Sequence, residues 1–425
     1  MVEIVPRALE RKLAEYVEDF RVVVVNGPRQ AGKTTLLRLH LRGRRGEFRT
    51  LDDPEMLLAA LADPVAFAAD APRPLCIDEV QRAGDPLVRA VKMVVDENWD
   101  AGSFILSGST RFLTVPTLSE SLAGRAAILE LWPLSMSERT RSFTNFVDQV
   151  FSDPEALRGG VSPWARHDYF QVIARGGYPE ALRMRSESTR RGWYDSYLET
   201  VVKRDLLEFV QIQQARSIPD LLALLAARAG STLVLADLAR SLGGLSVDTV
   251  RNYLSYLETV FLVGHVPAWS TNLTSKIAKA PKSYLTDSGL AAHLLDATPA
   301  TFANPVNRVL GGMTETFVYT ELMKALSVSS TSASLHHFRE HNDREIDFVL
   351  ETRDGRVVAI EVKASSSPPR DATANLRWMR DRLGDRFAGG YLLYLGEHTL
   401  SHGDRITAIP LSVLWGHAVL SGRQP

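Results

Sequence analysis

Residues 27–35 combine residue types that bind phosphate groups. Gly27 to Thr34 reads GPRQAGKT, which matches the pattern G-x-x-x-x-G-K-[ST] at every fixed position. The two glycines let backbone amides turn toward a phosphate, and the helix expected to follow adds its partial positive charge. Lys33 can reach the β- and γ-phosphates, and Thr34 can offer its hydroxyl to Mg²⁺. The sequence therefore predicts a nucleoside triphosphate site for ATP and Mg²⁺, rather than a glycine turn without a ligand, formed by Gly27, Pro28, Arg29, Gln30, Ala31, Gly32, Lys33, Thr34 and Thr35.

Two adjacent acids provide the next candidate chemistry. Asp78 and Glu79 end an apolar stretch that begins at Pro74, as in a Walker B strand. The carboxyl ends of parallel strands are where ligands lie in open α/β sheets. Asp78 is predicted to hold Mg²⁺, directly or through water, and Glu79 to polarise the attacking water. Lys33, through its contact with the phosphates, is also a catalytic candidate. The alternative is a strand end with two solvated acids.

Hydroxyl and guanidinium groups accompany the later predicted strands. Residues 103–110, SFILSGST, indicate a buried strand that ends in small hydroxyl residues; if the domain is an AAA+ ATPase, Ser107 or Ser109 would lie near the γ-phosphate. Arg125 precedes a strand expected over 126–131, and Arg111 follows the earlier strand. Either arginine could stabilise transition-state charge, in its own chain or across a subunit interface. An ordinary strand-to-turn transition and a solvated surface are the alternatives for the serines and the arginines.

A third set of charged residues lies toward the C-terminus. Glu315 falls in a helix expected over 311–326, Asp347 in a strand expected over 344–350, and Glu361 and Lys363 in a strand expected over 357–363. This arrangement resembles the PD-(D/E)xK nuclease fold. The resemblance implies that Asp347 and Glu361 supply oxygen ligands to one or two Mg²⁺ ions, with Glu315 completing the shell and Lys363 orienting water or the scissile phosphate. A fold that keeps buried ion pairs as a scaffold without cleavage is the alternative.

Several predicted elements position these groups. Val22 to Val25 forms a continuous β-branched run that suits a strand buried on both faces of a parallel sheet. Leu9, Leu13 and Val17 recur at helical spacing before it. A second strand is expected over 47–51, followed by a turn at Asp-Asp-Pro and a helix. The ATP-binding region is therefore predicted to be an α/β domain with a parallel sheet.

The middle of the chain has a different pattern. Residues 135–230 are typical of helices, with a break at 176–179, GGYP. A helix over 233–242, a second helix capped by Ser246, and strands over 263–269 and 283–286 together predict a winged helix. Lys276, Lys279 and Lys282 lie within seven residues of this hairpin, as expected of a wing that contacts DNA phosphates. A protein-interaction role is the alternative.

The motifs together resemble a known family. GPRQAGKTTLL, LDDP, CIDEVQR, ILSGST and SLAGRAAILELWPLS are similar to AAA+ ATPases of the AAA family-14 type that carry a C-terminal DUF4143 region. The resemblance implies an AAA+ P-loop ATPase core at 1–140, a helical lid or connector at 141–225, a winged helix-turn-helix at 226–295 and a PD-(D/E)xK nuclease-like α/β domain at 296–425. It also implies that the serine-ended strand is the sensor-1 strand, with Ser109 among the catalytic candidates beside Arg125.

The amino-acid composition excludes few classes of protein function. The 425 residues include 45% hydrophobic and 23% charged residues and carry a net charge of −1, so any nucleic-acid surface must be local. Cys76 is the only cysteine, which excludes an internal disulfide. The absence of a signal-like or membrane-spanning stretch leads us to expect a cytoplasmic protein without a membrane partner. The motifs and the composition together leave two hypotheses: an ATPase that acts on DNA, with a homo-oligomer among its candidate assemblies, or a nucleotide-switched scaffold that binds a protein partner.

Overall fold

The computed structural model describes residues 4–111, 122–157, 159, 161–202, 217–270, 279–340, 344–369, 371–417 and 419–420. The chain divides into two compact units. Unit 1 comprises Met1–Leu134 and Tyr256–Phe261, and unit 2 comprises Ser135–Ser255 and Leu262–Pro425. Within the described ranges, none of the helices has the length and apolar character needed to cross a membrane.

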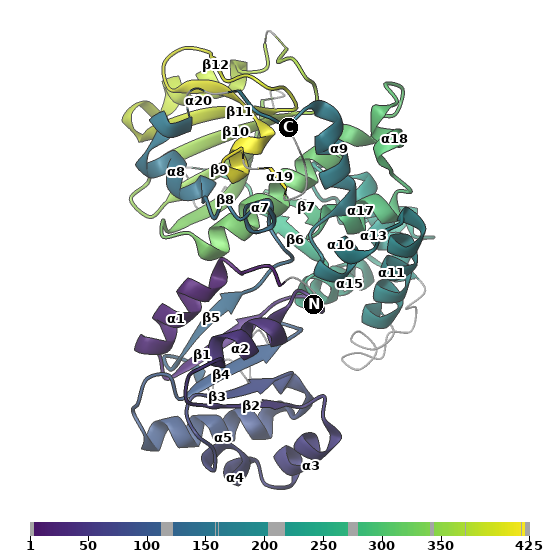
Figure 1. The fold of residues 1–425 in the computed structure, drawn as a ribbon. Helices are drawn as coiled ribbons and strands as arrows, with labels where there is room; N and C mark the ends of the chain where they lie inside the picture. The colour runs from purple at the N-terminus through teal and green to yellow at the C-terminus, as the bar shows by residue number, and fades with distance from the viewer. Residues whose placement is uncertain are drawn as a thin grey trace. The chain divides into compact units, whose positions relative to one another are not determined.

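Unit 1 is built on a five-stranded sheet whose paired strands all run parallel (Figure 1). The strand order is β2-β3-β4-β1-β5. The strands are β1 (Val22–Asn26), β2 (Glu47–Thr50), β3 (Leu75–Asp78), β4 (Phe104–Gly108) and β5 (Ala126–Glu130). Because β1 lies between β4 and β5, the loop after β1 is flanked by the carboxyl ends of both neighbours.

Helices cover both faces of this sheet: α1 (Leu9–Asp19), α2 (Lys33–Leu41), α3 (Pro54–Ala62), α4 (Pro64–Ala69) and α5 (Gly84–Glu97). Val22 and Val24 pack in one apolar cluster with Leu87 of α5 and Phe67 of α4. The alternate side chains, such as Val23, are also fully buried and point to the opposite face. There α1 and α2 contact the strands. The continuous valine run is thus buried on both sides, as predicted.

The Asp-Asp-Pro turn has a clear local cause. Asp53 accepts hydrogen bonds from the backbone amides of Glu55 and Met56, and Pro54 occupies the first helical position. Asp63 caps α4 in the same way through the amide of Ala66. Two capped helices therefore follow β2, where the sequence predicts one.

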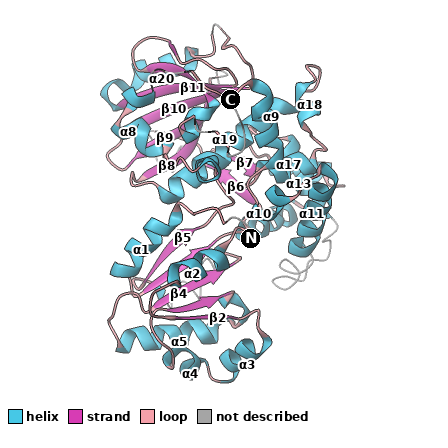
Figure 2. Cartoon of the chain, viewed as in Figure 1, coloured by secondary structure: helices cyan, strands magenta, loops and turns pink. Residues whose placement is uncertain are grey.

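Unit 2 begins with helices, as the pattern over 135–230 predicts (Figure 2). α9 ends at Arg175 and α10 begins at Pro179, so the predicted break at 176–179 is confirmed. The described α-helices of this part are α7 (Met136–Thr140), α8 (Phe146–Ser152), α9 (Arg166–Arg175), α10 (Pro179–Arg183), α11 (Glu187–Thr200) and α13 (Ser217–Ala227); α17 (Ser288–Leu294) and α18 (Pro299–Ala303) come later in the chain.

Two short helices and a hairpin occupy the stretch between α13 and α17. α14 (Leu235–Ser241) is followed by α15 (Val247–Thr259), whose first turn is capped by the Ser246 hydroxyl at 3.0 Å from the Thr249 amide. β6 (Val263–Val266) pairs antiparallel with β7 (Lys282–Leu285). On α15, Tyr253 and Leu254 are buried while Arg251 is exposed, as the amphipathic pattern predicts.

A six-stranded mixed sheet forms the C-terminal part of unit 2, in the order β12-β13-β11-β10-β9-β8. β9 is antiparallel to both β8 and β10, and β10 is parallel to β11. α19 (Val309–Val328) and α20 (Ala374–Leu383) contact this sheet. The strands are β8 (Ala333–Arg339), β9 (Glu345–Thr352), β10 (Val357–Lys363), β11 (Phe387–Tyr394), β12 (Leu400–Ser401) and β13 (Ile406–Pro410).

The break between α9 and α10 is held by one buried carboxylate. Asp287 is fully buried and accepts hydrogen bonds from the amides of Gly177 (2.7 Å) and Leu290 (2.9 Å) and from the hydroxyl of Tyr194 (3.1 Å). A Cβ on Gly176 would lie 2.2 Å from the same carboxylate, so glycine is required there. Asp287 therefore joins three separate segments of unit 2.

We expect Asp287→Ala to lower the free energy of unfolding by about 3 kcal/mol, because it leaves three buried donors without their acceptor. Urea denaturation of the full chain measures the effect. The matched control is Asp195→Ala, whose side chain is 71% exposed and pairs with His293 at the surface. A change of similar size in both variants would contradict the role given to Asp287.

Candidate functional site

The loop after β1 has the backbone of a phosphate-binding loop. Gly32 adopts φ 101°, a left-handed conformation, and α2 begins at the next residue, Lys33. Gln30 is also left-handed, with φ 60°. The Lys33 ammonium donates hydrogen bonds to the carbonyls of Gly27 (2.9 Å) and Pro28 (3.0 Å), so its side chain folds back against the loop that precedes α2. The helix N-terminus and the ammonium therefore converge on one point, as anion binding requires.

Gly27 is needed for close packing. A Cβ at this position would lie 2.1 Å from the carbonyl oxygen of Leu131, the residue after β5. The Leu131 amide in turn donates to the carbonyl of Asn26 at 2.8 Å. The first glycine of the motif therefore lets the loop leave β1 directly beside β5.

Arg7 supports the loop from the N-terminal segment, a role that the sequence did not reveal. Its guanidinium donates to the carbonyls of Ala31 and Trp132, each at 2.6 Å. These two bonds join the loop to the chain beyond β5. Nothing in the local spacing around Arg7 distinguishes it from the other arginines of the chain.

Asp78 lies where the Walker B prediction requires. Its carboxylate accepts a hydrogen bond from the Thr34 hydroxyl at 2.7 Å and another from the Ser107 hydroxyl. Burial raises the pKa of Asp78, and the two hydroxyl donors oppose that shift. The predicted magnesium ligands Thr34 and Asp78 are thus brought together, with Ser107 beside them.

Glu79 is buried and held in a left-handed backbone conformation, with φ 56°. This is uncommon for a residue with a side chain and is typical of functional sites. Its carboxylate accepts hydrogen bonds from Ser109 (3.1 Å) and from the amide of Gln81, which also donates to Ser109 at 3.1 Å. Gln81, in the short 3₁₀ turn after β3, completes a polar group that sequence reasoning missed.

Three buried polar atoms at this edge suit a polar ligand. Asn26 Oδ1, Gln81 Oε1 and Thr110 Oγ1 have no hydrogen-bond partner among the described residues. Asn26 ends β1, and Gln81 and Thr110 follow β3 and β4, so all three lie at the carboxyl ends of strands that surround the loop. Buried polar atoms are normally paired, so water or a ligand is the expected partner. The donor and acceptor set therefore fits a magnesium-bound triphosphate.

The structure separates the two arginine candidates. Arg125 precedes Ala126, which pairs with Val22, the first residue of β1. It therefore lies at the opposite end of the strands from the phosphate-binding loop. There its guanidinium pairs with Asp96, at 3.1 Å for Nη2, and holds the pKa of that carboxyl at about 2. Arg111 lies at the carboxyl end instead, 3.3 Å from Glu130.

The C-terminal acids are also brought together, but with a partner that was not predicted for them. The register places Ile360 opposite Phe348, so Glu361 and Asp347 follow at the next position of each strand. Asp347 accepts a hydrogen bond from the Val362 amide at 2.9 Å. Lys363 pairs with Glu361 at 2.8 Å, which confirms that these two side chains share a face.

Lys282 of β7 lies among these acids. Its ammonium is 3.1 Å from Glu315, 3.4 Å from Asp347 and 2.6 Å from Glu345. Lys282 is fully buried, so the prediction that it contacts DNA phosphates is wrong. Lys279 donates to the carbonyl of Arg339, and Lys276 lies outside the described residues.

The predicted magnesium shell is not formed as expected. Glu315, the proposed third ligand, is engaged by Lys282 and by the hydroxyl of Tyr284. No cluster of three or more His, Cys, Asp or Glu residues with metal-binding geometry occurs in the described part of the chain. Burial raises the pKa of both Glu315 and Glu361, with Asp347 adding to the shift. One oxygen, Glu361 Oε2, is buried without a hydrogen-bond partner among the described residues.

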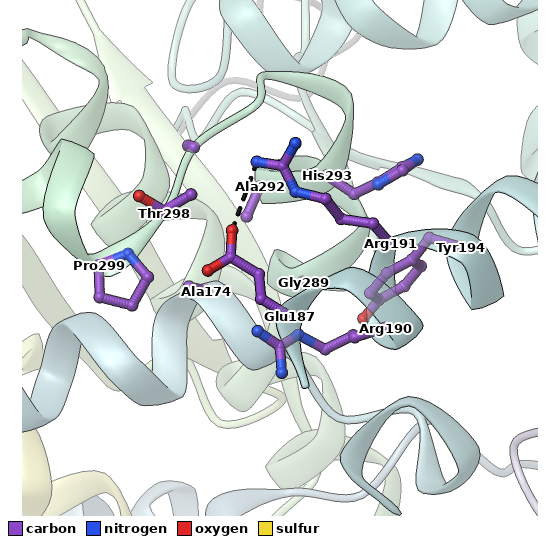
Figure 3. Close-up of a pocket in the computed structure, with 11 residues that line it drawn as sticks. Ala174, Glu187, Arg190, Arg191, Tyr194, Gly289, Ala292, His293, Thr298 and Pro299 are labelled. Carbon is purple, nitrogen blue, oxygen red and sulfur yellow. Dashed lines mark ion pairs between the residues drawn. The ribbon is translucent and has the colours of Figure 1, made fainter. Parts of the chain in front are cut away.

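A polar pocket lies elsewhere in unit 2, between α11, α17 and the chain before α18 (Figure 3). Arg190, Arg191 and His293 bring basic groups to it, and Glu187 pairs with Arg191 at 3.4 Å. Arg191 also pairs with Asp296, and His293 with Asp195. Its positive charge is therefore largely balanced by neighbouring acids.

The chain matches three described families. Residues 19–140 match an AAA domain, residues 166–301 a domain of unknown function (DUF8612), and residues 310–414 a domain of unknown function (DUF4143). The second match begins within the stretch predicted as a lid, at residue 166, and covers the whole stretch predicted as a winged helix.

Similar whole proteins and solved structures were also found. The uncharacterized proteins Rv2008c of Mycobacterium tuberculosis and Mb2031c of Mycobacterium bovis are each 31% identical over 393 residues, which cover 92% of this chain and 80% of theirs. The Walker-type ATPase PABY2304 of Pyrococcus abyssi is 15% identical, with a TM-score of 0.42, over 68% of this chain and 96% of that one. The Holliday junction branch migration motor RuvB of Thermotoga maritima is 20% identical, with a TM-score of 0.29, over 61% and 89%. TM-scores of this size do not establish a common fold.

The sequence relatives and the order of the matched domains agree with the motifs of the chain. It belongs to the AAA family-14 proteins that carry an N-terminal AAA domain and a C-terminal DUF4143 region.

Proposed function

We propose that this protein is a magnesium-dependent ATP hydrolase. The observation that carries the proposal is the 2.7 Å hydrogen bond between the Thr34 hydroxyl and the Asp78 carboxylate. It joins the start of the phosphate-binding helix to the end of the Walker B strand. These are the two groups that hold Mg²⁺ in P-loop nucleotide hydrolases.

Each neighbouring residue then has a distinct task. The loop amides and the Lys33 ammonium would bind the phosphate oxygens, and Thr34 and Asp78 would hold a magnesium ion that neutralises the phosphate charge. Glu79 orients a water molecule and accepts its proton, while Ser109 and Gln81 fix the position of the Glu79 carboxylate. Arg111 is the nearer of the two arginine candidates for stabilising developing charge, and Arg125 would have to act on a neighbouring subunit.

We further propose that ATP turnover is coupled to DNA through the region 226–295. Two helices followed by an antiparallel hairpin support a winged helix, and Thr232 bridges to Lys282 as an additional edge of that hairpin. Arg251, Asn252 and Ser255 are exposed on α15 and could contact phosphates or bases. The buried position of Lys282 removes one expected phosphate contact.

A second candidate is a nucleotide-switched scaffold with an inactive nuclease-like domain. The specific observation that favours it is the pairing of the C-terminal acids with lysines of the same chain. The PD-(D/E)xK-like fold remains our proposal for residues 296–425, supported by α19, the β8–β9–β10 order and the place of Glu361 and Lys363 on one strand. Such a domain would bind a protein partner instead of cutting DNA.

Replacing Glu79 with glutamine should lower kcat for ATP hydrolysis roughly 100-fold or more, because the amide cannot accept a proton from water. Binding of ATP should persist, since Glu79 does not contact the loop. A phosphate-release assay measures turnover, and Glu55→Gln, an exposed glutamate of α3, is the control. Equal turnover in wild type and Glu79→Gln would reject Glu79 as the base.

Lys33→Ala should weaken magnesium–ATP binding about 10- to 100-fold, because it removes charge-assisted hydrogen bonds to the phosphates. Calorimetric titration with ATP measures this. Lys92→Ala, a surface lysine paired with Asp96, should bind ATP like the wild type. Undiminished affinity in Lys33→Ala would contradict the placement of the triphosphate.

Binding of duplex and branched DNA separates the two candidate functions. If α15 contacts DNA, Arg251→Ala should weaken binding about 3- to 10-fold, and the affinity should fall as salt is raised. Arg185→Ala changes an exposed arginine before α11 and serves as the control. The absence of DNA binding by the wild type, measured by fluorescence anisotropy, would favour the scaffold.

A further inference from the structure

The ammonium of Lys282 has the surroundings of a bound cation. Three carboxylates lie within 3.4 Å of it, from Glu315 on α19 and from Glu345 and Asp347 on β9. The Lys282 side chain has no exposed surface, and those of Glu315 and Asp347 are 15% and 12% exposed. The charge is therefore balanced by protein groups instead of water.

The alternation of strand residues produces this arrangement. Glu345 and Asp347 are two positions apart on β9 and point to the same face, where Asp347 also meets the Val362 amide. Lys282 and Tyr284 are likewise two apart on β7, and both contact Glu315. Two strands and a helix that are distant in sequence thus direct their charged groups to one point.

Three ion pairs surround the ammonium of Lys282. Its distances to Glu315, Glu345 and Asp347 are 3.1, 2.6 and 3.4 Å, so each neighbouring carboxylate can compensate for the water that burial removes. A buried ammonium without these acids would be very costly. The three ion pairs therefore place the Lys282 ammonium where a bound cation would balance these acids.

A divalent ion does not fit this position while Lys282 occupies it. Mg²⁺ and Ca²⁺ bind carboxylate oxygens at about 2.0–2.6 Å and would need the oxygens that Lys282 now engages. Two cations cannot share that space. The nuclease resemblance implies that Glu315 is a ligand of Mg²⁺. In this structure Glu315 instead accepts hydrogen bonds from Lys282 and Tyr284.

We propose that Lys282 is the resident cation of the acidic centre formed by Glu315, Glu345 and Asp347, and that it excludes a divalent metal ion from this position. The ion pairs of Lys282 also link β7 to α19 and to β9. The hairpin is thus part of the acidic centre, and its lysine is not available to a nucleic acid phosphate. The inference rests on contacts inside unit 2 and does not depend on ATP hydrolysis.

The test is the number of Mn²⁺ ions bound by the full chain without nucleotide, measured by electron paramagnetic resonance. Lys282→Met keeps an unbranched side chain, one atom shorter than that of lysine, and removes the ammonium, which leaves the three acids without their cation. We expect this variant to bind one more Mn²⁺ than the wild type. Its melting temperature should be lower than that of the wild type and should rise by about 5 °C with saturating Mn²⁺.

Two variants serve as controls. Lys279→Met changes the neighbouring exposed lysine and should bind Mn²⁺ like the wild type. Adding Glu315→Gln to Lys282→Met should abolish the extra Mn²⁺, because it removes one of the three ligands. An unchanged Mn²⁺ count in a folded Lys282→Met chain would overturn the inference.

A second measurement applies if Lys282→Met does not fold. The wild type and Glu315→Gln should then bind the same number of Mn²⁺ ions, since no ion uses Glu315 in the presence of Lys282. A lower count in Glu315→Gln would mean that a metal ion already occupies the centre, and the inference would fall. Neither result depends on ATP turnover, which is measured separately with Glu79→Gln.

Discussion

A buried carboxylate needs hydrogen-bond donors or a cation beside it. This requirement determines which side chains surround Asp78 in unit 1 and which surround the acids of the C-terminal sheet in unit 2. Asp78 is the first case. Its two oxygens accept hydrogen bonds from the hydroxyls of Thr34 and Ser107, which lie in the first turn of α2 and in β4. Since desolvation raises the pKa of a buried acid, these donors keep the charged form accessible. The same contacts fix the distance between the phosphate-binding loop and the Walker B strand.

The C-terminal acids are paired with lysines. Lys282 forms ion pairs with Glu315, Glu345 and Asp347, and Lys363 forms one with Glu361. An ammonium is a strong donor but cannot act as a Lewis acid, so the two solutions have different chemical consequences. Hydroxyl donors at Asp78 can be shared with a metal ion, because a hydroxyl oxygen is itself a metal ligand. A lysine in contact with the same oxygens competes with a metal ion instead.

Much of the fold could be predicted because its elements obey local rules. The valine run of β1 and the caps at Asp53 and Ser246 all depend on neighbours in sequence. The phosphate-binding loop was predictable for the same reason, since its residues are contiguous. The sequence did not indicate β12, β13 or α18, which are short and lack a clear periodicity.

The parts that sequence reasoning missed depend on contacts between distant segments. Arg7 is 125 residues from Trp132, whose carbonyl it binds, and Lys282 is 65 residues from Asp347. Lys282 in particular was interpreted from its neighbours as a surface residue of a basic hairpin. One signal was present: Lys282 and Tyr284 share a face of a strand whose other residues are apolar or small, and such a strand is normally buried. A lysine in a buried strand requires an acid opposite it, and the strand at Glu345 to Thr352, which begins with two acids at the same spacing, provides that partner.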